Sequence, residues 1–133
     1  ISIKKQIDME QKHIDLIRRL IQSTKNKKIE WQKSSAKWQY RLELNAATFV
    51  VDRIYDYDDP YNQSPENTIT CYSLNMYNGD NTEIRIAYVT DADFTSDYQL
   101  MEELYQEAEE SCIRENETIN KVIDELDKLD LPY

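Results

Sequence analysis

The chain has 133 residues, with 16 Lys/Arg against 26 Asp/Glu and a formal net charge of −10. This length fits a single domain, residues 1–133, that buries a core without disulfides or metal. No apolar run approaches the ~20 residues of a membrane span, so we expect no membrane contact. With one Gly and one His, the chain lacks a P-loop, a dinucleotide-binding glycine motif and an HExxH zinc site. We therefore expect no cofactor and no enzymatic activity.

The charge is divided unevenly along the chain. Residues 1–41 carry 11 Lys/Arg against 4 Asp/Glu, and residues 42–133 carry 5 against 22. A charge field of this kind steers association without specifying a fold. The acidic part indicates a partner with a basic surface.

The residue pattern predicts the order helix, five short strands, helix. Apolar residues at three-, four- and seven-residue steps predict a helix over residues 1–26, on the stripe Ile3, Ile7, Ile14, Ile17 and Ile21. Over residues 28–90 the period changes to two, which predicts a strand meander. Asn78-Gly79 predicts a type I′ hairpin turn.

Residues 96–130 are predicted to form one helix, or two nearly coaxial helices with a break near Asn116. Ser96 and Gln99 match a capping box at its start. The apolar stripe of the first half keeps its phase in the second half, at Ile119, Val122, Ile123, Leu126 and Leu129. Short connections favour an α+β fold, with an N-terminal helix, an antiparallel five-strand meander and the closing helix packed on one face of the sheet. The basic and acidic helices then lie side by side, so we expect internal ion pairs.

The segments Leu20-Ile21 and Lys28-Ile29-Glu30-Trp31, followed by a meander and a closing helix, resemble small uncharacterised bacterial accessory proteins. The resemblance implies the same order of elements. It implies no activity and no site.

Cys71 and Cys112 are interpreted as buried thiols in a reducing compartment, because disulfide-stabilised secreted chains usually carry more cysteines. A cytoplasmic location is therefore expected. The chain begins at Ile1 rather than Met, so a removed signal peptide stays open as an alternative.

Two acidic surfaces are the predicted partner-binding sites. The first is the loop containing Tyr55, Asp56, Tyr57, Asp58, Asp59 and Tyr61. Tyrosine provides contact area at low entropic cost, and carboxylates complement a basic partner. The second is the acidic face of the closing helix, at Glu103, Glu107 and Glu110. The simpler interpretation is a solvated turn and a solvated helix face.

A calcium site is weighed as an alternative because five residues have the ligand spacing of an EF-hand loop: Asp91, Asp93, Thr95, Asp97 and Glu102. Ser96 stands where the loop requires glycine, and a strand rather than a helix precedes it. We therefore expect no metal.

Nucleic-acid binding is a second alternative, since the basic N-terminal segment includes Trp31 and Trp38. The i,i+4 pairs Lys4–Asp8 and Asp15–Arg19 argue against it, because they indicate a salt-bridged helix surface.

These observations favour a small acidic protein-binding domain, of the inhibitor, immunity or anti-defence kind, that masks a basic partner. A structural or oligomerising module is the main alternative, in which the closing helix and the isoleucine stripe pair with a second copy as a homodimer.

Overall fold

The computed structural model describes residues 9–93 and 95–129. It confirms the predicted α+β fold, a meander sheet of strand order β1-β2-β3-β4-β5 between two helices. Each strand is antiparallel to its neighbour in the sheet. The elements are α1 (Gln11–Lys25), β1 (Gln32–Lys33), β2 (Gln39–Glu43), β3 (Ala47–Tyr57), η1 (Pro65–Asn67), β4 (Thr68–Asn78), β5 (Glu83–Thr90), η2 (Asp91–Asp93) and α2 (Ser96–Leu129). Neither helix in these ranges is long and apolar enough to cross a membrane.

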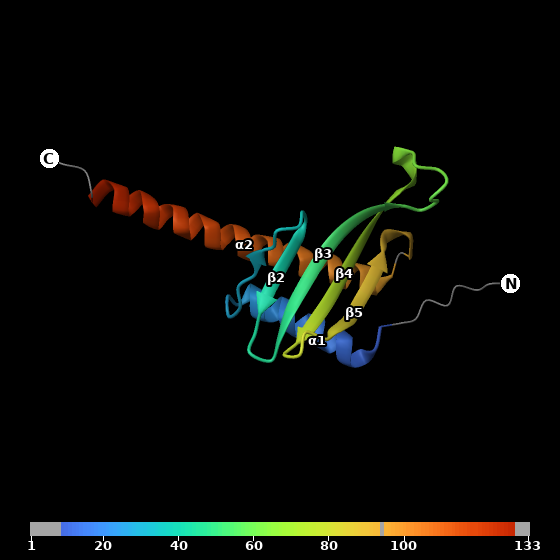
Figure 1. Ribbon diagram of the computed structural model, residues 1–133, viewed down its shortest axis with the longest axis horizontal. Helices are drawn as coiled ribbons and strands as arrows, with labels where there is room; N and C mark the ends of the chain where they lie inside the picture. Colours follow the sequence, from blue (N-terminus) through green and yellow to red (C-terminus); the bar gives the residue numbers. More distant parts are fainter. Residues whose placement is uncertain (1–8, 94, 130–133) are drawn as a thin grey trace.

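Both helices lie on the same side of the sheet (Figure 1). The N-terminal half of α2 contacts all five strands, α1 packs beside it, and the C-terminal half of α2 projects beyond the sheet. Alternate strand residues face the helices, because side chains of a strand point to opposite faces in turn. The core between the layers includes Ile17, Leu20, Leu42, Phe49, Val51, Leu74, Met101 and Leu104.

A row of tyrosine rings joins the sheet to α2. Tyr105 on α2 lies 5.5 Å from the ring of Tyr40 and 5.4 Å from that of Tyr72, measured between centroids. Tyr72 in turn packs against Tyr98 at 5.5 Å. Burial raises the pKa of Tyr98 to about 12 and raises the pKa of Tyr105 as well. The rings therefore stay neutral at physiological pH and act as apolar packing groups.

The face of the sheet away from the helices mixes polar side chains with apolar ones such as Ile54. Gln39, Asp52, Ser73 and Tyr88 are neighbours in register across four strands. The Gln39 Nε2 donates a 2.7 Å hydrogen bond to an Asp52 carboxylate oxygen. Burial raises the pKa of Asp52. The hydrogen bond from Gln39 partly offsets the cost of burying this carboxylate.

Within the described residues, helix α1 begins later than predicted. Glu10 has extended backbone angles and Met9 donates its N–H to the Asp97 carboxylate, so the helix begins at Gln11. The predicted stripe residues Ile3 and Ile7 lie outside the described residues. The predicted stop is confirmed, since Asn26 is the C-cap.

The hairpin after Asn78 is present, but the predicted two-residue type I′ turn is wrong. Four residues separate β4 from β5, and the positive φ of 60° falls on Asn81, not on Gly79. The Asn78 side chain accepts hydrogen bonds from the backbone N–H of Asp80 and Thr82. An asparagine that bonds its own loop in this way favours a wider turn.

Helix α2 is continuous over 34 residues, so the alternative of a break near Asn116 is wrong. The predicted Ser96–Gln99 capping box is wrong. The Thr95 hydroxyl, not that of Ser96, accepts the N–H of Tyr98 at 3.3 Å, so Thr95 occupies the N-cap position.

Both edges of the sheet are irregular. Strand β1 has two residues. The pairing of β5 with β4 shifts by one residue beside Leu74 and Asn75 of β4. Leu74 pairs with Ala87, whereas Asn75 pairs with Arg85. Ile86 is therefore an extra residue, a β-bulge, and it points into the core.

The end of α1 provides a stability test. Lys28 donates its N–H to Ser23 and Lys27 to Thr24, a Schellman pattern in which Lys27 adopts φ 60°. Lysine carries a steric cost in this conformation that glycine avoids. We expect Lys27→Gly to stabilise the fold by about 1 kcal/mol, measured by urea unfolding.

Lys28→Gly is the matched control, because Lys28 is not among the residues with positive φ. It should leave the free energy of unfolding unchanged or lower it. Equal effects of the two variants would contradict the assignment of strain to Lys27.

Candidate functional site

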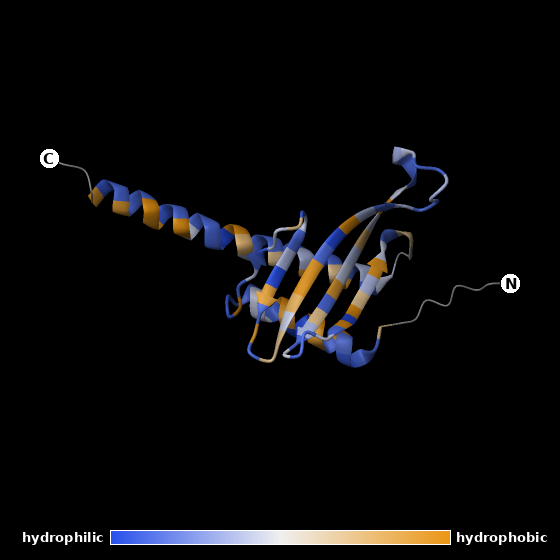
Figure 2. Ribbon diagram, viewed as in Figure 1, coloured by the Kyte–Doolittle hydropathy of each residue, from blue (hydrophilic) through white to orange (hydrophobic). Residues whose placement is uncertain are grey.

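The most distinctive surface is the projecting part of α2, Ile113–Leu129, here called the arm. The apolar stripe of α2 is buried up to Cys112, which is 6% exposed. Beyond it, Ile119, Val122 and Ile123 are each 48% exposed, Leu126 is 54% and Leu129 77%. Figure 2 shows the apolar segments recurring along the arm. The stripe that anchors α2 to the sheet thus continues past the body without anything in the described chain covering it.

The arm leaves the body at a buried set of hydrogen bonds. The Trp31 backbone N–H donates to the Ser111 hydroxyl at 3.0 Å, and the Trp31 indole N–H donates to the Thr24 hydroxyl at 3.0 Å. Thr24 in turn donates to the Leu20 carbonyl at 2.7 Å. Trp31 is fully buried, so the idea that this ring stacks on nucleic-acid bases is wrong.

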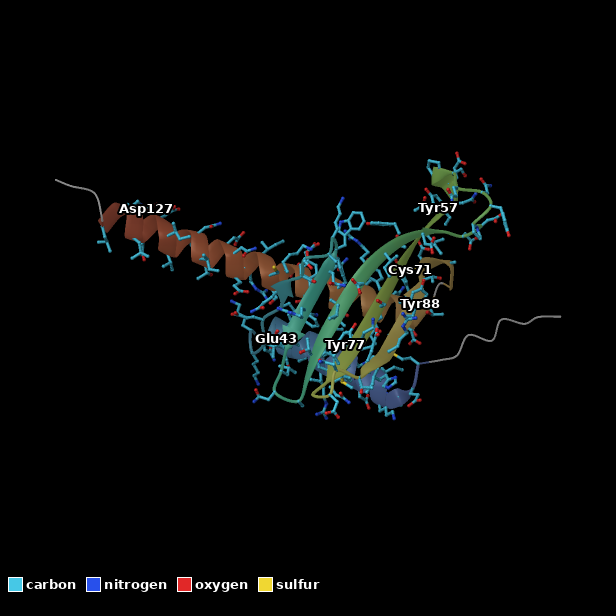
Figure 3. All side chains as sticks on the ribbon, viewed as in Figure 1. Glu43, Tyr57, Cys71, Tyr77, Tyr88 and Asp127 are labelled. Atoms are coloured by element: carbon cyan, nitrogen blue, oxygen red, sulfur yellow. The ribbon has the colours of Figure 1, made fainter. Side chains whose placement is uncertain are left out.

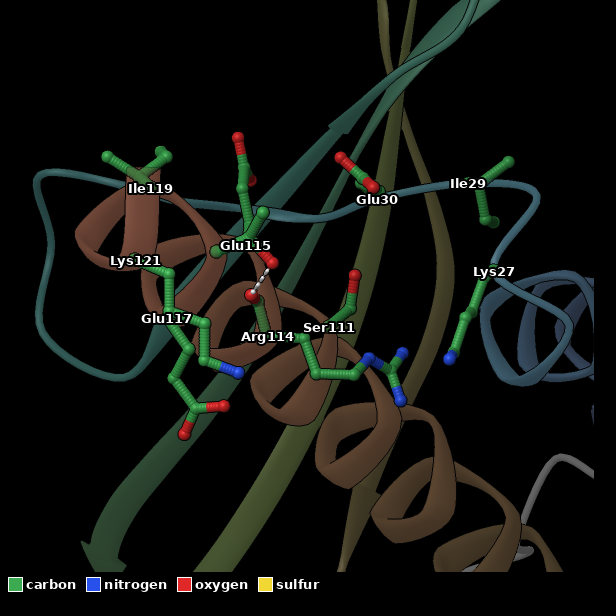
Figure 4. A pocket seen from close by; sticks show the side chains of 10 residues that line it. Lys27, Ile29, Glu30, Ser111, Arg114, Glu115, Glu117, Ile119 and Lys121 are labelled. Atoms are coloured by element: carbon green, nitrogen blue, oxygen red, sulfur yellow. Dashed lines mark hydrogen bonds between the residues drawn. The ribbon is translucent and has the colours of Figure 1, made fainter. Parts of the chain in front are cut away.

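A hollow of about 350 Å³ lies at the base of the arm (Figure 4). Lys27 and Arg114 point toward one another there, and Arg114 also donates to the Thr24 carbonyl at 3.4 Å. Carboxylates of Glu30, Glu115 and Glu117 complete much of the lining. Small-molecule pockets are mostly apolar, whereas this hollow is charged, so it is better suited to the rim of a protein contact.

The predicted acidic loop lies at the end of the β3–β4 hairpin, remote from the arm (Figure 3). Tyr55 and Asp56 are successive strand residues, so their side chains face opposite sides of the hairpin. Tyr55 packs edge-on against Trp38, with centroids 4.8 Å apart. Asp59 accepts the N–H of Tyr61 at 2.9 Å, a local turn contact, and Tyr61 is 97% exposed. Asp58 is also exposed.

The predicted acidic helix face is used partly within the chain. A Glu103 carboxylate oxygen lies 2.7 Å from the Lys25 Nζ, which confirms an ion pair between the basic and acidic helices. The hydrogen bond with Glu103 raises the pKa of Lys25, with added attraction from Glu107 and Glu110. Glu110 is exposed, whereas Glu103 and Glu107 are half-buried.

Two of the calcium candidates make other contacts. Thr95 caps α2, and Asp97 accepts the N–H of Met9 at 3.4 Å. Asp91 lies in η2 and Glu102 lies within α2. The side chain of Asp93 is outside the described residues. Among those described, no group of three or more His, Cys, Asp or Glu is placed to share a metal.

The sequence predicts pairing of the closing helix with a second copy only as an alternative and does not single out the arm, although a signal is present. A helix of 34 residues spans ~51 Å, whereas five strands side by side span ~19 Å. A helix that crosses such a sheet must therefore extend beyond it. The exposed apolar stripe follows from this mismatch in length.

The chain was compared with protein-family models, curated proteins and solved structures, and none of them matches. Function is therefore inferred from geometry.

The hydrogen bonds at the base of the arm give a second stability test. Ser111→Ala leaves the buried Trp31 N–H without its acceptor, so we expect a loss of about 1–3 kcal/mol in the free energy of unfolding. Thr118→Ala is the control, because the Thr118 hydroxyl bonds the Arg114 carbonyl on the exposed surface of the same helix. It should change stability by less than about 0.5 kcal/mol. Similar losses in urea unfolding would contradict the role given to Ser111.

Proposed function

We propose that this chain is a protein-binding module whose arm pairs with an amphipathic helix. The observation that supports this most directly is the change of the α2 stripe from buried at Cys112 to half-exposed at Ile119 and beyond. A contiguous exposed apolar surface on an otherwise polar element is typical of an interaction site.

The spacing of the stripe indicates the shape of the partner. Ile119, Val122, Leu126 and Leu129 follow one another at steps of three, four and three residues, the a and d positions of a heptad. This seam is narrow, with Ile123 alone widening it. A narrow seam matches one facing helix better than it matches a flat sheet.

The energetics require an apolar partner. Completing the burial of the five exposed apolar side chains of the stripe contributes about 1 kcal/mol each, or roughly 5 kcal/mol from the arm. Association costs about 4–15 kcal/mol in lost freedom of motion. The arm therefore binds measurably only when the partner buries a comparable stripe, as an amphipathic helix does.

A synthetic helix tests this proposal with the full-length chain. The probe is a fluorescently labelled peptide of about three heptads with Leu at every a and d position. We expect Leu126→Glu to weaken its binding at least tenfold, measured by fluorescence anisotropy, because the variant places a charge in the seam.

Ile113→Glu is the matched control, since Ile113 is 49% exposed on the same arm but lies off the seam. It should leave probe affinity within about twofold of the unmodified chain. Absence of probe binding, or equal weakening by both variants, would contradict helix pairing.

A second candidate function is the masking of a basic partner by the acidic end of the β3–β4 hairpin. The favouring observation is the projection of this hairpin: β3 continues to Tyr57, whereas its register with β2 ends at Asp52. Asp56, Asp58 and Asp59 are exposed at its end. Exposed carboxylates increase the association rate with a basic surface.

A lysine-rich peptide is the probe for this second function. Two-dimensional NMR with the ¹⁵N-labelled chain should show salt-sensitive shifts clustered at residues 56–61. The shifts should disappear when Asp56, Asp58 and Asp59 are all replaced by Asn. Shifts confined to Glu103, Glu107 and Glu110 would instead assign basic-partner binding to α2.

A further inference from the structure

We infer that the helix bound by the arm is the arm of a second copy, in antiparallel orientation. This inference rests on the proposed function, because it names the partner of the same seam. It is supported by the symmetry of the seam and by the position of the body relative to it.

The seam is self-complementary when one copy is reversed. A two-fold axis near Asp124 places Ile119 opposite Leu129 of the second copy and Val122 opposite Leu126. Each apolar layer then joins an a residue to a d residue, the pairing that antiparallel coiled coils use. The two copies present the same surface to each other, as a closed two-fold interface requires.

The position of the body excludes the parallel arrangement. At the base of α2, the stripe continuous with the seam faces the sheet and α1, where Leu104, Tyr105 and Cys112 are buried. Paired helices lie ~8–10 Å apart, and a sheet layer alone needs ~10 Å. In a parallel pair, the sheets of both copies would therefore have to fit between the two helices, where there is no room for even one sheet. The arm of one copy projects away from its sheet (Figure 1), so reversing the second copy places its body beyond Leu129 of the first.

The charges beside the seam are mixed in the antiparallel pair. Lys121 and Glu125 lie on the same flank of the arm, one helical turn apart. The axis near Asp124 places Glu125 of each copy about 3 Å along the helix from both Lys121 and Glu125 of the other. Two opposite-charge pairs and one like-charge pair then flank the apolar layers, so the register is set by the apolar seam.

The contact between the two arms is small, so we expect the dimer to be weak. Each copy contributes five apolar side chains, namely Ile119, Val122, Ile123, Leu126 and Leu129. This is less surface than the ~800 Å² per partner of a standard interface. We therefore expect a reversible dimer with a dissociation constant in the roughly micromolar range.

Sedimentation of the full chain tests the partner. Over roughly 1–500 μM, the weight-average mass should rise from monomer toward dimer. Leu126→Glu should raise the dissociation constant at least tenfold, and Ile113→Glu should leave it within about twofold. Thermal unfolding of each variant checks that the body stays folded.

Cysteine cross-linking tests the orientation. Val122→Cys and Leu126→Cys are prepared as separate proteins, with the unmodified chain as control because Cys71 and Cys112 are buried. An antiparallel pair predicts a disulfide mainly in the mixture, between position 122 of one copy and 126 of the other. A parallel pair in register predicts disulfides within each separate protein.

The outcomes separate this inference from the proposed function. A chain that binds the synthetic helix but remains monomeric at every concentration overturns the second copy and leaves helix pairing intact. A chain that neither binds the synthetic helix nor dimerises overturns both. Cross-linking within the separate proteins overturns the antiparallel orientation.

Discussion

The hydrogen bonds of Trp31 with Ser111 and Thr24 join the three parts of this molecule at one buried point. They link the last turn of α1, the entry into the sheet and the last turn of α2 that contacts the body. Because these polar groups are removed from water, each needs its partner, and the geometry is restricted accordingly. The direction in which the arm leaves the body depends on this point.

Both the helical state and the orientation of the arm depend on how α2 packs on the body. A helix of about 17 residues is marginal in water, because forming the first turn is unfavourable. Here the first turns of α2 are already formed against the sheet, so the arm only extends an existing helix. The stripe keeps its phase across Cys112, and the seam therefore faces the same direction as the buried core surface. The apolar stripe of α2 is thus buried where the sheet covers it and exposed beyond the end of the sheet.

The order of elements could be predicted from sequence because helix and strand periods differ clearly along the chain. The turn after Asn78 could not, since the Asn78 side chain bonds to its own loop and selects a wider connection. The candidate binding sites were also hard to predict, because they depend on tertiary packing. The period of α2 indicates an apolar stripe but not where the covering surface stops, so it does not show which part of the helix is left exposed. Glu103 was predicted to face a partner, and its pairing with Lys25 depends on how the helices pack.

The irregular edges of the sheet restrict how copies of this chain can meet. Strand β1 is too short to guide an added strand, and the bulge at Ile86 interrupts the backbone ladder of β5. Strand-by-strand growth, the route to fibrils, lacks a straight template at either edge. A further strand therefore meets no long regular ladder at either described edge, whereas the backbone groups of α2 are already bonded within the helix.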